Sequence, residues 1–483
     1  VYKRQAGTGA RSSLAEAQLH GDETIETPYG EIVLEHGYVT DEGQERLFDA
    51  MDFQRAAQAY VWSTPLVSFT TWRMEQERTF DGGALGTFAV LRTLAEKRGI
   101  VTGNLTTPYI FQFASLADGP IVVDYPAGAT AGAWIDAWQR STTDLGLTGP
   151  DQGAGGRYVL VGPSDDPAKY EGEGDFVFRS PTVQVGIGFR LLDPRPEFER
   201  QVKDTIKMGR FGQPLEPCVF REGVDEEWSA TAYRGLDYWR MLQSALDDEP
   251  VREQDKVWTA MLGPLGIRKG AAFDPDERQT RILLEGAAFG ELLARNLQVV
   301  PRYVEPYWPG TSWYKSFDFS MAQSTDYKVE LDERTTWFYE AVSATYGMIS
   351  PSVGKGQVYM TTKRDSDGAL LRADQTYRLS VPADVPAAQF WSLTLYSENT
   401  RRPYDNGGDT IESINLDNRM DQLVYNDDGS IDLYIGAEAP DGMEPNFMRT
   451  VGDDGWFVYF RLYGPTQPFF DKTFALPDFE RID

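Results

Sequence analysis

The chain has 483 residues and a formal charge of −28 at pH 7, from 74 acidic and 46 basic residues. Its hydrophobic fraction of 41%, with 12 Trp, 24 Tyr and 26 Phe, is ample for folded cores and excludes a largely disordered chain. The strong negative charge, without a Lys- or Arg-rich stripe, repels phosphate backbones, so nucleic acid is not an expected partner. The longest uncharged run, 99–117, is interrupted by polar residues and Pro, so we expect a soluble protein without a transmembrane segment.

Cysteine and histidine are too scarce for several common chemistries. Cys218 is the single cysteine, which excludes an intramolecular disulfide and a Cys-based zinc or iron–sulfur site, and we expect it to be a small buried hydrophobe. The two histidines, His20 and His36, leave little room for a Ser-His-Asp mechanism or a His-rich metal centre. The sequence therefore predicts neither a metal nor a cofactor.

The first part of the chain predicts a flexible segment and then a helix. Residues 1–24 are polar and without periodicity, which is typical of a flexible lead-in. A short strand is expected at 31–34, followed by an amphipathic helix over 44–62 that Ser63-Thr64-Pro65 closes. Because the sequence begins at Val1 rather than Met, we expect the true N-terminus and any export signal to lie outside it.

A strand-rich region follows, over about 107–192. Val183, Val185, Ile187, Phe189 and Leu191 alternate with polar residues and glycines, which predicts a half-buried strand. Short strands separated by turn residues favour a β-sandwich. Together with the preceding helix, this sandwich is expected to form an N-terminal domain over 25–195.

Helical periodicity returns over 196–300, where Asp274-Pro275-Asp276 is typical of a helix start. The region 301–483 opens with an aromatic-rich stretch and a helix near 332–348, and continues as strands separated by Gly, Pro, Asn and Asp. The sequence therefore predicts a mainly β fold with a helical middle segment, in which the C-terminal domain is a jelly-roll β-sandwich.

Carboxylates beside aromatic residues are the first candidate chemistry. In a sandwich, two carboxylates about 5 to 10 Å apart in an aromatic-lined cleft can cleave a glycosidic bond, while aromatic faces stack on sugar rings. The catalytic candidates are Asp124, Glu305, Glu340 and Glu398. The aromatic ligand-binding candidates are Tyr109, Tyr125, Trp391 and Tyr396.

The second candidate feature is a pair of arginines, Arg190 and Arg461, each of which interrupts a strongly apolar strand. A guanidinium in such a place either forms a structural ion pair or binds a carboxylate-bearing or polyol ligand. The sequence leaves both roles open.

Four segments resemble a known two-part family. They are Gly103-Asn104 through Thr107-Pro108-Tyr109, Tyr158-Val159-Leu160-Val161-Gly162-Pro163, Phe390-Trp391-Ser392-Leu393-Thr394-Leu395-Tyr396 and Arg461-Leu462-Tyr463-Gly464-Pro465. Together with the helix start at 274–276, these segments make the chain similar, over about residues 25–483, to a family of proteins. Its members join an N-terminal domain of unknown function 1254 to a C-terminal domain of unknown function 1214. The resemblance implies two β domains around a helical segment and, through the frequent export of family members, a periplasmic or secreted location. It implies no catalytic residues.

Two functions remain open at this point. In the first, the protein binds or hydrolyses a carbohydrate or small polar ligand with carboxylates in an aromatic-lined cleft. In the second, it is a non-catalytic structural or binding protein that forms a homo-oligomer through its β domains.

Overall fold

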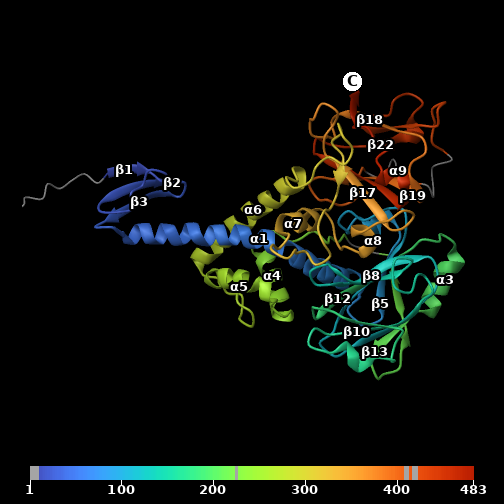
Figure 1. Cartoon of the computed structure of the whole chain (residues 1–483), viewed down its shortest axis with the longest axis horizontal. Coiled ribbons are helices and arrows are strands. Elements are labelled where there is room, and N and C mark those ends of the chain that lie inside the picture. Colours follow the sequence, from blue (N-terminus) through green and yellow to red (C-terminus); the bar gives the residue numbers. More distant parts are fainter. Residues whose placement is uncertain (1–9, 224–226, 407–412, 416–421, 483) are drawn as a thin grey trace, which may run out of the picture. The chain divides into compact units, whose positions relative to one another are not determined.

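The computed structural model describes residues 10–223, 227–406, 413–415 and 422–482 (Figure 1). The chain divides into two compact units, each assembled from segments that are distant in sequence. The first unit comprises Val1–Trp62, Arg234–Gln243 and Arg252–Leu293. The second comprises Ser63–Tyr233, Ser244–Val251 and Ala294–Asp483.

A small sheet opens the first unit. Its strands, in spatial order, are β1 (Ala10–Ser13), β2 (Glu23–Thr27), β3 (Gly30–Glu35) and β4 (Tyr38–Val39). The prediction of a flexible lead-in over 1–24 is therefore wrong for β1 and the start of β2. This segment has no apolar periodicity, and hydrogen bonds hold it in place instead. The Glu23 carboxylate accepts one from Ser12 Oγ at 2.6 Å and one from the Leu19 backbone amide at 2.9 Å.

Helix α1 (Asp41–Phe80) contributes residues to both units. The predicted end of this helix at Ser63-Thr64-Pro65 is wrong, because the helix continues through Pro65. An interior proline costs about 3 kcal/mol of helix stability. Burial offsets this cost, since residues 63–72 are all buried and the Pro65 carbonyl accepts a hydrogen bond from Gln139 Nε2 at 2.8 Å.

The other helices of the middle segment are α4 (Leu236–Asp248), α5 (Lys256–Leu262) and α6 (Glu277–Val299). Within the first unit, α6 packs closely on α1. A Cβ atom built on Gly286 would lie 2.3 Å from the Cβ of Ala56, so only glycine allows this approach. Helix α4 is bound to α6 by Trp239, whose Nε1 donates to the Leu283 carbonyl at 2.8 Å.

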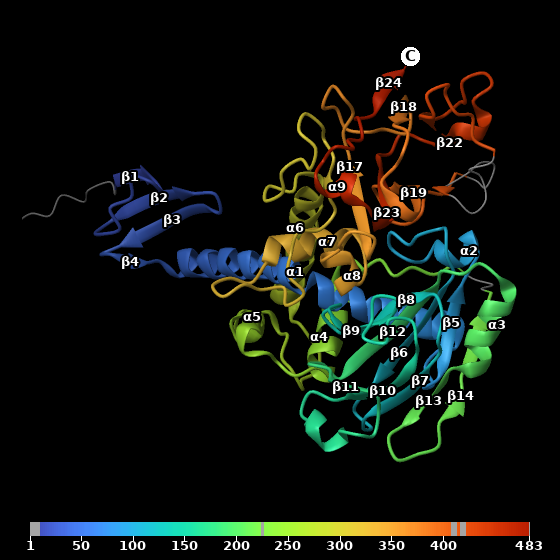
Figure 2. The ribbon, with the colours of Figure 1, turned by 45° about the vertical axis from the view of Figure 1, so that its right-hand side comes forward.

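The second unit contains an N-terminal sandwich of two sheets (Figure 2). The six-stranded sheet has the order β15 (Val219–Glu222), β5 (Thr87–Leu91), β6 (Tyr109–Ser115), β12 (Gln184–Leu191), β8 (Thr130–Asp136) and β9 (Ser141–Gly146). The five-stranded sheet has the order β11 (Phe176–Arg179), β10 (Gly156–Val161), β7 (Ile121–Tyr125), β13 (Lys207–Arg210) and β14 (Glu216–Pro217). Helices α2 (Leu94–Lys97) and α3 (Pro196–Thr205) flank the strands.

The strand predicted from the alternation at 183–191 is confirmed as β12. Its residues Val185, Ile187, Phe189 and Leu191 lie in the core between the two sheets. Gly186, Gly188 and Arg190 therefore belong to the opposite, outer face of the six-stranded sheet. On that face the ring of Phe111 lies directly over the two glycines.

A C-terminal sandwich completes the second unit. One sheet has the order β16 (Tyr314–Lys315), β17 (Gln357–Thr362), β23 (Trp456–Pro465), β19 (Ala387–Ser397) and β20 (Ser413–Asn415). The other has the order β22 (Phe447–Arg449), β21 (Ile431–Gly436), β18 (Thr376–Val381) and β24 (Glu480–Ile482). Helices α7 (Leu331–Glu340), α8 (Tyr346–Ile349) and α9 (Gln467–Phe470) accompany them. The predicted fold class, mainly β with two sandwiches and a helical middle segment, is confirmed.

Replacing Gly188 with Ala should destabilise the second unit. The added Cβ would lie 2.0 Å from Cδ2 of Phe111, so the ring must move. Overpacking of this kind lowers the free energy of unfolding by about 1–3 kcal/mol. Urea denaturation of Gly188→Ala against Gly83→Ala, where a Cβ meets nothing within 4 Å, measures the effect. Equal stability of the two variants would contradict this packing.

Candidate functional site

A cavity lies in the second unit, between the outer faces of the six-stranded and the C-terminal five-stranded sheet. Its volume is about 100 Å³. About 10–15 Å³ suffices for a single water, so the cavity has room for a small organic molecule. Its lining comes from strands β5, β6, β8, β12, β17 and β23, from helices α1, α7 and α8, and from residues 100–103 and 341–345.

Strand alternation explains why polar side chains reach the cavity. In β23, Trp456, Val458, Phe460 and Leu462 fill the core of the C-terminal sandwich. Tyr459 and Arg461 therefore belong to the outer face, and both line the cavity. Across the cavity, Tyr109 and Phe111 of β6 and Arg190 of β12 occupy the corresponding face of the six-stranded sheet.

Arg461 is 2% exposed and has no carboxylate within ion-pair distance among the residues that the structure describes. Its Nη2 donates to the Thr102 carbonyl at 2.9 Å, while Nε and Nη1 have no hydrogen-bond partner there. The guanidinium carbon lies 5.0 Å from the ring centre of Tyr459 and 5.1 Å from that of Tyr359. Burial opposes its charge, but the surrounding phenols, Tyr396 foremost, raise the pKa above its ordinary value.

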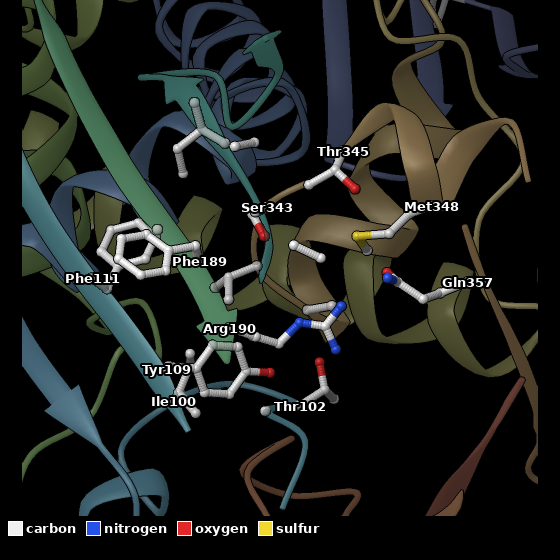
Figure 3. Close-up of a pocket in the computed structure, with 18 of the residues that line it drawn as sticks. Ile100, Thr102, Tyr109, Phe111, Phe189, Arg190, Ser343, Thr345, Met348 and Gln357 are labelled. Carbon is white, nitrogen blue, oxygen red and sulfur yellow. The ribbon is translucent and has the colours of Figure 1, made fainter. Parts of the chain in front are cut away.

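Arg190 brings a second guanidinium to the same cavity. Its Nη1 donates to the phenol oxygen of Tyr463 at 3.3 Å, and its guanidinium carbon lies 5.4 Å from that ring. Figure 3 shows the guanidinium extending towards the side chains of Thr102 and Gln357 and the hydroxyl of Tyr109. Among the described residues, no Asp or Glu lines the cavity. Both arginines thus carry positive charge into a wall that supplies no negative one.

Backbone strain concentrates in the two loops at the cavity wall. Thr102 has φ of 44° and Ser343 has φ of 59°, which a β-branched or ordinary residue rarely adopts. Specific bonds hold both, since the Thr102 amide donates to the Arg401 carbonyl at 2.7 Å and the Ser343 amide to Gln139 Oε1 at 2.7 Å. Strained residues that the surroundings hold in place are concentrated at ligand sites.

Lys97 lies behind Tyr109 and adds to the positive potential. Its Nζ donates to the Thr107 carbonyl at 2.9 Å and lies 5.9 Å from the Tyr109 ring centre. Burial, with a smaller contribution from the charge of Arg190 and against the attraction of Glu96, lowers the pKa of Lys97 to about 7. The loop between Lys97 and Tyr109 is closed by the backbone N–H of Asn104, which donates to the Tyr109 hydroxyl at 2.9 Å.

A buried acid–base cluster lies next to the cavity wall. Tyr459 donates its hydroxyl proton to Glu340 Oε1, and Lys363 Nζ pairs with Glu340 Oε2 at 2.7 Å. Glu398 accepts from Gln298 Nε2 at 3.3 Å, and burial together with the charge of Glu340 raises its pKa against the attraction of Lys363. Glu340 and Glu398 therefore share one electrostatic environment, but neither lines the cavity.

The other two carboxylate candidates lie elsewhere in the second unit. Asp124 forms a bidentate pair with Arg157 at 2.7 and 2.9 Å on the surface of its sheet. Glu305 is exposed in the loop before β16. The structure thus brings together Glu340 and Glu398 only, and it places Glu340 in an internal ion pair.

The aromatic candidates divide between the cavity and the cores. Tyr109 lines the cavity, and Tyr396 contacts Arg461 with its ring centre 5.5 Å from the guanidinium carbon. Tyr125 is a core residue of the N-terminal sandwich and donates to Thr130 Oγ1 at 2.8 Å. Trp391 packs in the core of the C-terminal sandwich, 5.3 Å from the ring of Phe460.

Sequence reasoning missed several residues of the wall. Tyr459 alternates with Arg461 in β23, so the arginine alone was a signal for it. Thr102, Gln357 and Tyr359 carried no comparable signal, because they reach the cavity through a strained loop and a strand that was not singled out. Cys218, expected to be a small buried hydrophobe, is partly buried and packs against the core of the N-terminal sandwich, and this burial raises the pKa of its thiol to about 12.

No group of three or more His, Cys, Asp or Glu among the described residues is arranged to hold a metal ion. Among the same residues, none of the helices combines the length and the apolar character needed to cross a membrane.

The fold and the cavity define a class: a protein of two β-sandwiches whose outer sheet faces enclose two buried arginines. Residues 85–207 match the family described as protein of unknown function DUF1254. Residues 356–467 match the family described as protein of unknown function DUF1214. The chain carries these two domains in this order, and the resemblance seen in the sequence is confirmed.

A solved structure shares the fold. The chain is similar to the VPA0106 protein from Vibrio parahaemolyticus, with a TM-score of 0.52 and 15% identity, over 89% of this chain and 100% of that one. A structure of an uncharacterized protein from Burkholderia cenocepacia matches with a TM-score of 0.39 and 13% identity, over 92% and 97% of the two chains. No protein of curated function matches the chain.

Lys97 should make stability depend on pH. Its pKa lies at about 7 in the folded chain against an ordinary 10.5, so the unfolded chain binds the proton more tightly between these values. Stability contributed by neutral Lys97 therefore rises with pH from about 7 to 10, by up to about 1.4 kcal/mol per pH unit. Urea denaturation of wild type and Lys97→Met across this range measures the difference. Parallel pH profiles would show that Lys97 titrates normally.

Proposed function

We propose that the chain binds a small organic anion in this cavity, with Arg190 at its negative group and Arg461 adding the second positive charge. The observation that carries the proposal is the pair of buried guanidiniums in a wall without a carboxylate. A buried charge without a counter-charge is costly, and removing one partner of a buried ion pair costs about 3–5 kcal/mol. A bound anion supplies the missing charge.

A carboxylate is the group that these donors fit. Guanidiniums bind carboxylates through paired, charge-assisted hydrogen bonds. The phenol of Tyr109, the hydroxyl of Thr102 and the amide of Gln357 lie around Arg190 and can donate to the same group (Figure 3). Binding of the anion would also favour the protonated form of Lys97, which lies behind Tyr109.

The hydrolytic version of the sequence hypothesis has weaker support. It needs two carboxylates facing one ligand, and none of Asp124, Glu305, Glu340 or Glu398 lines the cavity. A carbohydrate fits the two arginines best as an acidic sugar. The alternative of a non-catalytic binding protein accommodates the same cavity, and homo-oligomer formation and export stay predictions from the sequence.

Arg190→Gln should lose binding of organic acids. Hydrogen bonds to charged groups contribute about 1.5–3 kcal/mol, which corresponds to roughly a 10- to 150-fold loss of affinity. Isothermal titration of acetate, benzoate and glucuronate into wild type and variant measures this loss. Arg157→Gln, which removes an exposed pair with Asp124, is the matched control and should bind as wild type does. A wild-type protein that binds none of these acids would overturn the proposal.

A second variant separates a binding role of Arg461 from a structural one. Arg461→Met removes a buried charge with two unpartnered nitrogens and replaces it with an apolar chain. Replacing a buried charge with an apolar residue is often neutral or stabilising, so the free protein should keep its melting temperature while losing acid-induced stabilisation. A large drop in melting temperature without ligand would show instead that Arg461 mainly supports the fold.

A further inference from the structure

The wall of the cavity is polar around Arg190 and mostly apolar elsewhere, and this division restricts the kind of anion that fits. Around the guanidinium of Arg190 lie the polar groups of Tyr109, Thr102 and Gln357. Most of the remaining wall is apolar and contributed by aliphatic, aromatic and thioether side chains. Among them are Trp72, Leu91, Ile100, Phe111, Ile135 and Met348.

The polar groups of the wall are poorly suited to a sugar or to inorganic phosphate. Sugar-binding sites typically use carboxylates as strong acceptors for the hydroxyl protons, and none lines the described wall, whose side-chain acceptors are the Gln357 amide and the hydroxyls of Ser, Thr and Tyr residues. Arginines bind phosphate as well as carboxylates, but a phosphate dianion brings a second charge and more acceptor oxygens, for which a site typically adds a lysine, several backbone amides or a helix N-terminus. No lysine lines the described cavity. A carboxylate carries a single charge and two oxygens, which the two arginines and their neighbours can satisfy.

Size gives the third restriction. The space of about 100 Å³ is somewhat smaller than a cavity of about 150 Å³ that accommodates benzene. The body of the ligand is therefore no larger than one aromatic ring or a short aliphatic chain. Small residues create this space, since Ala131 and Ala133 occupy the cavity face of β8 where larger side chains would fill it.

We infer that the ligand is a monocarboxylate with a single-ring or short-chain apolar body, its carboxylate at Arg190 and its body against Phe111 and the alanines of β8. This inference rests on the proposed anion-binding function. It adds the requirement for an apolar body, because each Å² of apolar surface buried in the cavity stabilises the complex by about 25 cal/mol.

A titration series on the full wild-type chain tests the inference. Benzoate and hexanoate should bind at least about 10-fold more tightly than acetate, because each buried methylene adds about 0.8 kcal/mol. Both should bind more tightly than glucuronate or inorganic phosphate. Benzamide, which has the same body without the charge, should bind at least about 10-fold more weakly than benzoate.

The outcomes separate the two proposals. Equal binding of acetate, phosphate and benzoate would overturn the apolar-body inference and leave the anion function standing. Equal binding of benzamide and benzoate, or no binding by any acid, would overturn both.

A cavity-filling variant locates the body of the ligand. Ala133→Leu should abolish benzoate binding while acetate still binds, because the added side chain occupies the space of the body but not that of the carboxylate. Unchanged benzoate affinity in a variant with the wild-type circular dichroism spectrum would overturn the placement against β8. If the variant does not fold, the wild-type ligand series still decides the class of ligand.

Discussion

Two guanidinium groups are enclosed between the outer faces of two β-sheets, and the described wall around them contains no carboxylate. Such charges are costly to bury, so the surrounding structure must hold them in place by other means. The phenols of Tyr359, Tyr396, Tyr459 and Tyr463 do so through their ring faces and oxygens. Thr102, whose backbone has a positive φ, accepts a hydrogen bond from Arg461 with its carbonyl oxygen. The cavity is thus a place where the fold gives up some stability, which is typical of a binding site.

The arrangement follows from the two-residue period of β-strands. In β12 and β23 the apolar half of each strand builds a sandwich core, so the remaining half must face outward. An outward face of Phe, Tyr and Arg is covered in this unit by another sheet rather than by solvent. Two sandwiches that each have a complete core therefore share a third, mixed layer, and the cavity is the part of that layer that side chains leave open.

The sequence predicted the sandwich strands well, because alternation and turn residues are local signals. It also singled out Arg190 and Arg461, since a charged residue in an apolar strand is conspicuous, and Tyr109 as an aromatic ligand-binding candidate. It did not predict that Asp124 pairs with Arg157 or that Glu340 pairs with Lys363, because these partners are 33 and 23 residues apart in the chain. The continuation of α1 past Pro65 was missed for the same reason, since it depends on burial and on Gln139, a distant residue.

The most direct test is a crystal structure of the protein soaked with benzoate. We expect electron density for one acid in the cavity, with its carboxylate oxygens within about 2.7–2.9 Å of guanidinium nitrogens of Arg190 or Arg461. A cavity without the acid, in which both guanidiniums donate to carboxylates of the protein itself, would contradict anion binding.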